Sequence, residues 1–233
     1  MLLLLTFLHL FMSTHLSDTL TTDKPVLHYL VREPKTTSAK KKAIILLHGV
    51  GSNEEDLFGL AAQLPADYYI ISARGPYTIG PGRYAWYNVD FSTGKPVFDT
   101  RQEASSRTVI LQFIRQMKQQ YHFDEVYLGG FSQGAIMSFS IGLTHPGEVK
   151  GIIALSGRIL EEIRPGVVKN EALGHLKIFI SHGVQDGTLP IHYAREAKTY
   201  LQPLGVQLSY HEYNNIGHQI NGDVLKELNE WLR

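Results

Sequence analysis

The sequence predicts an α/β protein with a mostly parallel central sheet and helices on both of its faces. From Pro25 onward, short apolar runs alternate with helical patterns, which is typical of βα units. Several of these runs are continuous stretches of Val, Ile or Leu, as expected for strands covered on both sides. Because the 233 residues are 43% hydrophobic and no linker divides them, we expect a single domain over residues 25–233.

The individual elements follow from local patterns. Apolar residues from Val109 to Tyr121 recur every four positions and predict a helix that covers the sheet. Ser52 and Glu55 have the spacing of a capping box and predict the start of an earlier helix. We expect strands at 26–31, 43–47, 68–72, 125–129, 151–155, 177–181 and 207–213, and helices at 55–64, 108–121, 133–144, 191–201 and 223–232.

The segment 75–99 breaks this alternation. It is rich in Gly, Pro and aromatic residues and has neither a helical nor a strand period. A loop of this length is usually functional. Two interpretations stay open: its aromatic residues tack a surface loop to the body, or they line a substrate pocket, in which case Trp86 and Tyr87 are the candidates.

Composition excludes several classes of function. Twenty-two Lys plus Arg balance 22 Asp plus Glu, so no basic surplus favours a nucleic-acid partner. The chain has no Cys, which excludes disulfides, thiolate metal sites and a cysteine nucleophile. The zero net charge permits self-association, so a homodimer stays open.

Residues 1–24 are expected to be an N-terminal leader, disordered or the product of an over-extended start. The apolar run MLLLLTFLHLFM is too short to cross a bilayer as a helix, so no stable membrane insertion is expected. A signal peptide would have a basic start and a small-residue cleavage site, and neither is present. We therefore expect a cytoplasmic protein, or a secreted or periplasmic one if residues 1–11 belong to a signal peptide.

The pattern G-x-S-x-G at 130–134 indicates a serine nucleophile. It lies between a predicted strand and a predicted helix, which is the context that makes the motif informative. The flanking glycines let strand and helix approach closely, so that the Ser132 hydroxyl is exposed at the carboxyl edge of the sheet. The motif alone is also compatible with an ordinary Gly-rich βα turn.

A serine nucleophile needs a histidine base and a carboxylate, both downstream in this chain order. Asp186 follows the predicted strand at 177–181, and His218 follows the next strand at 207–213. Both therefore lie at the edge of the sheet to which Ser132 belongs. Chain order or position in an element disfavours the competing histidines, which are His48, His145, His182 and His211.

Charge on an attacked carbonyl oxygen requires two backbone donors. The amide of Gln133 follows the nucleophile directly. A second strand runs into the glycine-rich turn His48-Gly49-Val50-Gly51, where we assign the Val50 amide, with Gly51 as its nearest competitor. A dinucleotide loop is disfavoured here because no third glycine follows at the required spacing.

These motifs together resemble the phospholipase/carboxylesterase family of small α/β-hydrolases. The resemblance implies an α/β-hydrolase fold without a separate cap domain and a Ser132–Asp186–His218 triad. One departure is Tyr84, which is inserted in an element similar to the family's R-A-W-[FY]. The matching segments are Leu47 to Gly51, Gly130 to Gly134, Leu155-Ser156-Gly157, His182 to Pro190 and Gly217-His218.

The sequence therefore predicts a carboxylic ester hydrolase that needs neither metal nor cofactor. We expect its substrate to be a small-molecule ester or thioester with a short to medium acyl chain, cleaved through an acyl-serine. A lysophospholipase or an acyl-protein thioesterase stays open as an alternative, because pocket shape sets the choice of substrate. A non-catalytic binding module on the same fold is the remaining alternative.

Overall fold

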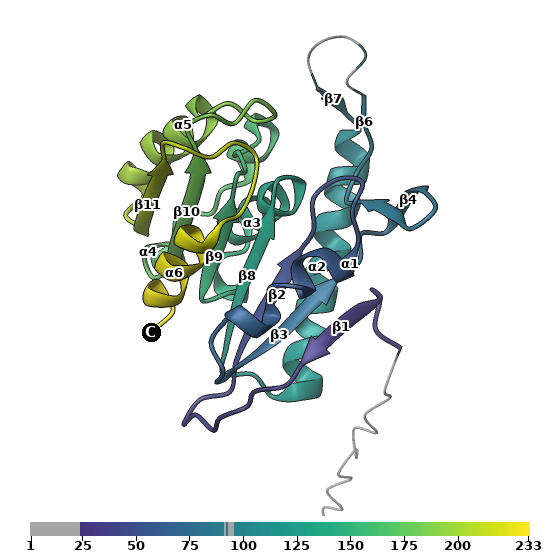
Figure 1. Ribbon diagram of the computed structural model, residues 1–233, viewed down its shortest axis with the longest axis vertical. Helices are drawn as coiled ribbons and strands as arrows, with labels where there is room; N and C mark the ends of the chain where they lie inside the picture. The colour runs from purple at the N-terminus through teal and green to yellow at the C-terminus, as the bar shows by residue number, and fades with distance from the viewer. Residues whose placement is uncertain (1–23, 91, 93–95) are drawn as a thin grey trace, which may run out of the picture.

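A seven-stranded sheet forms the centre of the protein in the computed structural model, which describes residues 24–90, 92 and 96–233 (Figure 1). The strand order is β1-β3-β2-β8-β9-β10-β11, parallel throughout except that β1 is antiparallel to β3. The mostly parallel sheet predicted from the sequence is confirmed. The strands are β1 (Tyr29–Arg32), β2 (Lys42–Leu47), β3 (Tyr68–Ala73), β8 (Glu125–Phe131), β9 (Gly151–Leu155), β10 (Lys177–Gly183) and β11 (Gln207–Tyr213).

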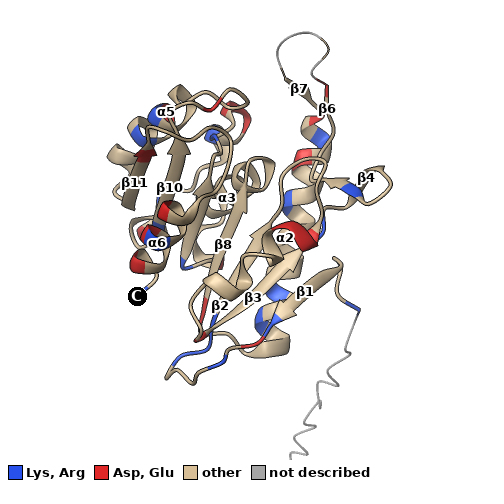
Figure 2. Ribbon diagram, in the orientation of Figure 1, with Lys and Arg blue, Asp and Glu red and all other residues tan. Residues whose placement is uncertain are grey.

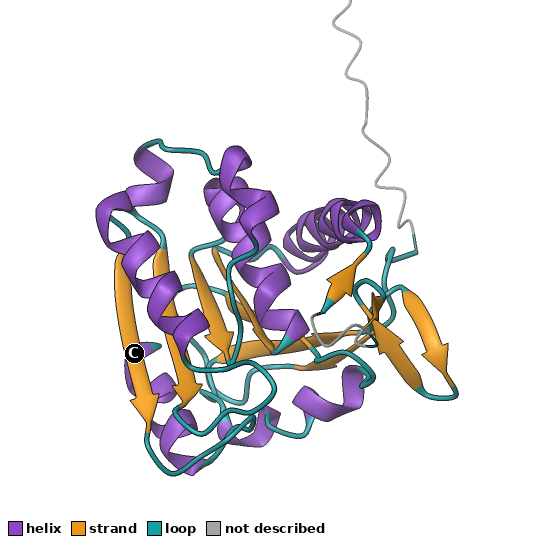
Figure 3. Cartoon of the chain, turned by 90° about the horizontal axis from the view of Figure 1, so that it is seen from above, coloured by secondary structure: helices purple, strands orange, loops and turns teal. Residues whose placement is uncertain are grey.

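Helices lie on both faces of this sheet (Figure 3). They are α1 (Glu54–Phe58), α2 (Thr100–Tyr121), α3 (Gln133–Thr144), α4 (Glu171–Gly174), α5 (His192–Leu201) and α6 (Gly222–Trp231), with short 3-10 turns at Ala61–Gln63, Pro146–Glu148, Glu161–Gly166 and Gln202–Leu204. Within the described residues, none of these helices combines the length and the apolar character needed to cross a bilayer.

Alternate residues of the strands supply two separate cores. On β2, Ile45 and Leu47 belong to the core that includes residues of α2, α3 and α5, whereas Ile44 and Leu46 belong to the core on the other face, with residues of α1 and α6. This follows from the two-residue period of a strand. Both faces of β2 are therefore buried from solvent, which explains the continuous apolar run in its sequence.

The predicted start and length of the first helix were wrong. Asn53, not Ser52, caps α1, because the Asn53 side chain accepts a hydrogen bond from the Glu55 amide at 2.9 Å. The Ser52 hydroxyl donates to Asp56 instead, at 2.7 Å. The helix ends at Phe58 rather than at residue 64, and a 3-10 turn continues the chain.

The segment 75–99 contains strands, contrary to the sequence-based prediction. Two small hairpins, β4 (Tyr77–Gly80) with β5 (Arg83–Ala85) and β6 (Val89–Asp90) with β7 (Val97–Phe98), project from the body (Figure 1). Strands of two to four residues are too short to establish a period in the sequence. Asp99 then caps α2, which begins earlier than its apolar stripe.

Charged residues of the two signs are interspersed over the elements. Figure 2 shows Lys and Arg next to Asp and Glu on the helices and strands of both halves of the sheet. Many of them are paired, for example Lys42 with Asp67 at 2.7 Å and Arg195 with Glu212 at 2.7 Å. This arrangement agrees with the zero net charge.

The turn from β8 into α3 depends on two glycines. A Cβ atom at Gly134 would lie 1.8 Å from the Leu47 carbonyl oxygen, and one at Gly130 would lie 2.4 Å from the carbonyl carbon of Gly134. No side chain fits at either distance. Strand β2, strand β8 and helix α3 can meet in this way only because both positions are glycine.

We expect Gly134→Ala to lower the free energy of unfolding by about 3 kcal/mol or more, because the clash is with backbone that cannot rotate away. Gly174→Ala is the matched control, since a Cβ atom there meets nothing within 4 Å and should change stability by less than about 1 kcal/mol. Urea denaturation of both variants measures the difference. Equal stabilities would contradict the assigned role of Gly134.

Candidate active site

Ser132 lies at a sharp turn between β8 and α3. Its backbone has φ 53° and ψ −114°, which for a residue other than glycine costs about 1–3 kcal/mol. The Ser132 amide donates to the Leu155 carbonyl of the neighbouring strand at 2.9 Å, and α3 begins at the next residue. The turn therefore holds the serine in one conformation at the carboxyl end of the sheet.

Asp186 and His218 are joined by a hydrogen bond. The His218 Nδ1 atom lies 2.7 Å from Asp186 Oδ2. The other carboxylate oxygen, Oδ1, accepts from the amides of Thr188 at 2.9 Å and Leu189 at 2.8 Å. Because both oxygens are engaged, the carboxylate cannot rotate, and the imidazole it holds keeps Nε2 free.

The Asp186–His218 pair comes from the loops after β10 and β11, and Ser132 from the end of β8, so all three lie at one edge of the sheet. The ring of Phe131, next to Ser132, packs against the His218 imidazole with 4.7 Å between ring centroids. The hydrogen bonds of the described residues do not include one between Ser132 and His218. In sites without substrate this contact is often long.

The glycine-rich turn after β2 lies beside Ser132. A Cβ atom at Gly49 would be 3.6 Å from the Ser132 Cβ atom. The Gly51 amide donates to the Tyr84 carbonyl at 2.8 Å, so it is already occupied. Among the described residues the Val50 amide has no such backbone acceptor. Of the two amides considered for this turn, Val50 is therefore the one free to bind a ligand oxygen.

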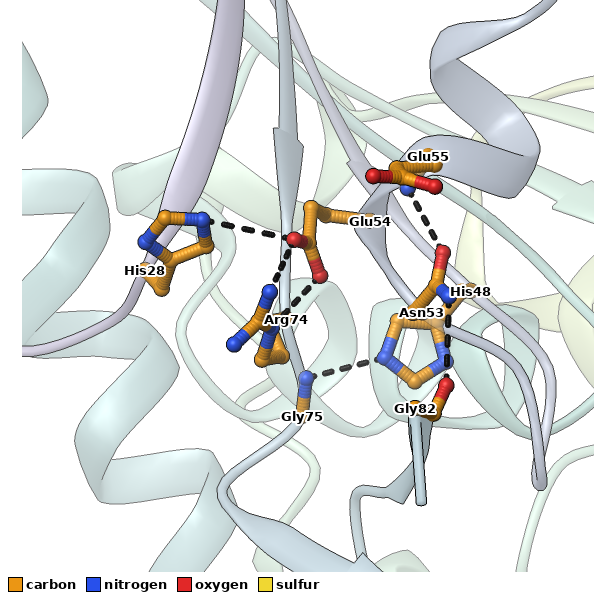
Figure 4. A network of polar contacts seen from close by, with 8 residues as sticks. All are labelled: His28, His48, Asn53, Glu54, Glu55, Arg74, Gly75 and Gly82. Atoms are coloured by element: carbon orange, nitrogen blue, oxygen red, sulfur yellow. Dashed lines mark hydrogen bonds and ion pairs between the residues drawn. The ribbon is translucent and has the colours of Figure 1, made fainter.

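His48 fixes the orientation of the peptide that carries this amide. The His48 Nε2 atom accepts a hydrogen bond from the Gly75 amide at 2.9 Å (Figure 4), so the proton must lie on Nδ1. Nδ1 in turn lies 2.7 Å from the Gly49 carbonyl oxygen and donates to it. The Gly49 carbonyl and the Val50 N–H belong to one planar trans peptide and point in opposite directions. The bond from His48 therefore directs the Val50 N–H away from the imidazole.

Trp86 and Gln133 connect the turn to the serine. The Gln133 side chain accepts from the Trp86 amide at 2.8 Å and donates to the Tyr87 carbonyl at 2.7 Å. The Trp86 indole N–H donates to the His48 carbonyl at 2.9 Å. A chain of buried hydrogen bonds thus runs from the residue after Ser132 to the residue before Gly49.

Both aromatic residues suggested as pocket residues lie in the core. Trp86 is 0% exposed and Tyr87 is 2% exposed. Burial raises the pKa of the Tyr87 hydroxyl well above its ordinary value. Neither ring faces solvent, so any contact of Trp86 or Tyr87 with a substrate stays a prediction.

An ion pair anchors the end of β3 next to Gly75 (Figure 4). The buried carboxylate of Glu54 accepts from Arg74 Nε at 2.6 Å and also from its Nη2 atom. The Arg74 guanidinium lowers the pKa of Glu54, and His28 lies 3.3 Å from the same carboxylate. Arg74 also covers the Tyr84 ring. The strand that presents the Gly75 amide to His48 is therefore held by a charged contact.

His182 supports the loop that carries Asp186. Its Nε2 atom donates to the Leu189 carbonyl at 2.6 Å and lies 3.3 Å from Asp186 Oδ2. The ring is buried, and burial lowers the pKa of His182 as it does that of His48. Both imidazoles are therefore neutral structural donors.

Comparison with known proteins identifies the family. The model of the phospholipase/carboxylesterase family matches residues 30–233. The chain belongs to the phospholipase/carboxylesterase family. The resemblance proposed from the sequence is confirmed, and so is the α/β-hydrolase fold.

Individual relatives agree with this assignment. The chain is similar to acyl-protein thioesterase 1 of Kluyveromyces lactis, with 26% identity over 218 residues, 87% of this chain and 95% of that protein. Among solved structures it is similar to esterase PE8, with a TM-score of 0.77, 26% identity and coverage of 89% and 98% of the two chains. A Bacillus cereus carboxylesterase at 24% identity shares the fold, with a TM-score of 0.74 and coverage of 88% and 92%.

Sequence reasoning did not find two roles in this family member. His48 was considered only as a competing base, although its position before the glycine-rich turn was visible in the sequence. The contact of the Gln133 side chain with Trp86 and Tyr87 spans more than 40 positions, and no local pattern carries it. Only the fold brings these groups together.

The free energy of unfolding should fall as the pH drops below 6.5, the ordinary pKa of histidine. The unfolded chain then takes up protons at residues 48 and 182, whereas the folded chain, in which both pKa values are lowered, does not. Each group contributes up to about 1.4 kcal/mol per pH unit until the pH reaches its lowered pKa.

His48→Gln and His182→Gln should each reduce this pH dependence, measured by urea denaturation at about pH 7.5 and about pH 5.5. His175→Gln is the control, because the His175 side chain is largely exposed. A pH dependence that neither buried replacement reduces would show that these histidines are not its source.

Proposed function

We propose that this protein is a serine hydrolase that cleaves carboxylic esters or thioesters of short to medium acyl chains through an acyl-serine intermediate. The observation that carries the proposal is the hydrogen-bonded pair of Asp186 and His218 at the sheet edge that also holds the strained Ser132. The free amides of Val50 and Gln133 beside that serine add to it. A protein that only binds a ligand would need neither the nucleophile, acid and base in this chain order nor the two free amides.

In the first step, the Ser132 hydroxyl oxygen attacks the carbonyl carbon and its proton passes to His218 Nε2. Asp186 keeps the proton of Nδ1 in place, so that Nε2 is the nitrogen able to accept. The imidazolium that forms is stabilised by the same carboxylate. His218 then gives the proton to the leaving alcohol or thiol, and the acyl group stays on Ser132.

The negative charge on the carbonyl oxygen is bound by the two amides. Gln133 is the first residue of α3, where a helix leaves its amides unpaired and favours negative charge. The Val50 N–H comes from the peptide that His48 orients. Water activated by His218 then hydrolyses the acyl-serine by the reverse sequence of proton transfers.

The relatives bear on the substrate. Relatives named as acyl-protein thioesterases and as an esterase favour acyl transfer to water from either oxygen or sulfur. Thioester hydrolysis is therefore the second candidate activity within the same mechanism.

We further propose that Trp86 and Tyr87 position the glycine-rich turn that carries Val50, since both rings are buried.

Ser132→Ala and His218→Ala should each lower kcat for p-nitrophenyl esters by about 10⁴-fold or more, because nucleophile and base act as a unit. Asp186→Asn should cost about 10⁴-fold or somewhat less, through loss of the correct tautomer. A chain-length series from acetate to palmitate, with acyl thioesters of matched length, measures both activity and preference. Wild-type turnover in Ser132→Ala would refute the proposal.

Trp86→Phe removes the donor to the His48 carbonyl but keeps an aromatic ring in the core. We expect kcat/KM to fall about tenfold with little change in KM, because the turn loses its fixed position. Binding of a trifluoromethyl ketone, which places an oxyanion at the two amides, should weaken by the same factor.

Trp231→Phe is the matched control for this measurement, since it is the other of the two tryptophans and packs at the end of α6. Unchanged inhibitor binding in a folded Trp86→Phe protein would contradict the positioning role.

A further inference from the structure

A second chain of serine, histidine and carboxylate lies outside the candidate active site. Ser209 and His211 are two positions apart on β11, so their side chains share one face of the sheet. Helix α6 runs over that part of the sheet and carries Glu227 (Figure 1). The Ser209 hydroxyl oxygen lies 2.8 Å from His211 Nε2, and His211 Nδ1 is paired with Glu227 Oε2.

The partners decide where the protons lie. An ionised carboxylate only accepts, and Glu227 also accepts from the Tyr213 hydroxyl at 2.9 Å. In the neutral imidazole, Nδ1 therefore carries the proton toward Glu227. His211 Nε2 is then the acceptor, and the Ser209 hydroxyl is its donor. This is the polarity that activates a serine as a nucleophile.

The imidazole is held in this orientation by packing. The His211 ring stacks on the Phe179 ring, with 4.9 Å between centroids and 30° between planes. Its side chain is nevertheless 29% exposed and that of Glu227 is 39% exposed, and Ser209 is half-buried. The three side chains therefore lie at the partly exposed edge of the sheet rather than inside its core.

A backbone donor is also available next to Ser209. Gln207 donates its amide to Leu176, and Tyr213 accepts from Val184, so the odd-numbered residues of β11 bond toward the inside of the sheet. Alternate residues of a parallel strand bond to opposite sides. Because β11 is the last strand of the sheet, the Tyr210 amide faces the open edge. Tyr210 follows Ser209 as Gln133 follows Ser132.

We propose that Ser209 is a second acyl-accepting serine, which reacts with small activated esters independently of Ser132. The Ser209 oxygen forms a bond to the carbonyl carbon, and its proton passes to His211 Nε2. The bond from that carbon to the leaving oxygen breaks, p-nitrophenolate departs as an anion, and the proton on His211 is released to solvent. The product from p-nitrophenyl acetate is acetyl-Ser209. This reaction goes beyond the proposed function and does not rest on it.

The experiment uses the full chain with Ser132→Ala, treated with p-nitrophenyl acetate and analysed by peptide mass spectrometry. We expect one acetyl group to accumulate on Ser209 faster than on Ser105, an exposed helical serine with no histidine partner among its described hydrogen bonds. Adding Ser209→Ala should remove that acetylation. It should also remove the slow release of p-nitrophenolate left in Ser132→Ala.

Two further variants test the relay itself. In the Ser132→Ala background, His211→Gln and Glu227→Gln should each slow acetylation of Ser209 about tenfold or more, because the base or its orienting group is lost. Circular dichroism checks that each variant is folded, and the exposed Glu227 keeps the test valid if His211→Gln unfolds. Acetylation of Ser209 no faster than of Ser105, or unaffected by both replacements, would overturn the proposal. Ester turnover by the wild-type protein tests the role of Ser132, whereas acetylation of Ser209 is measured in Ser132→Ala. Failure of one proposal therefore leaves the other unaffected.

Discussion

The contact between α3 and the Leu47 carbonyl is the constraint on which the rest of the site depends. Leu47 is the last residue of β2, and the turn with Gly49 and Val50 follows it directly. Gly134, the second residue of α3 and two residues after Ser132, lies against the Leu47 carbonyl. This close contact limits the separation between the two elements that carry the proposed oxyanion donors, Val50 and Gln133. Because the contact is between backbone atoms, no side-chain rotation can relieve crowding there, and the two elements cannot approach more closely.

Three histidines at the carboxyl ends of the strands differ in their surroundings because their partners differ. His48 and His182 are buried, and each gives its N–H to a carbonyl oxygen, so neither can take up a second proton without the cost of burying a charge. For His48, protonation would also break the bond from Gly75. His218 is 18% exposed, is held by the Asp186 carboxylate and has a free Nε2 atom. These surroundings favour His218 as the proton carrier of the proposed mechanism, with the other two as neutral supports.

The sequence predicts those features that a local pattern encodes. All seven strands of the sheet and helix α3 were found, because apolar runs and the G-x-S-x-G pattern are properties of neighbouring residues. The cap at Asn53 was missed because Ser52 has the same chemistry one position earlier. The hairpins within 75–99 were missed because they are too short to show a period. The link from Gln133 through Trp86 to His48 depends on tertiary contacts alone, so no sequence pattern could reveal it.

The two proposed nucleophiles, Ser132 and Ser209, differ mainly in their backbone. Ser209 has the same kinds of hydrogen-bonded groups as a catalytic triad, but it lies on a regular strand. Ser132 lies on a strained turn at the start of a helix. Beside it is a second turn, in which the hydrogen bond from His48 to the Gly49 carbonyl orients the Val50 amide. Loss of one oxyanion donor costs about 10²–10³ in rate, so Ser209 should react slowly although its side chains are in place. On the two proposals, the geometry of the backbone, more than the side chains, distinguishes a serine that turns over substrate from one that only accepts an acyl group.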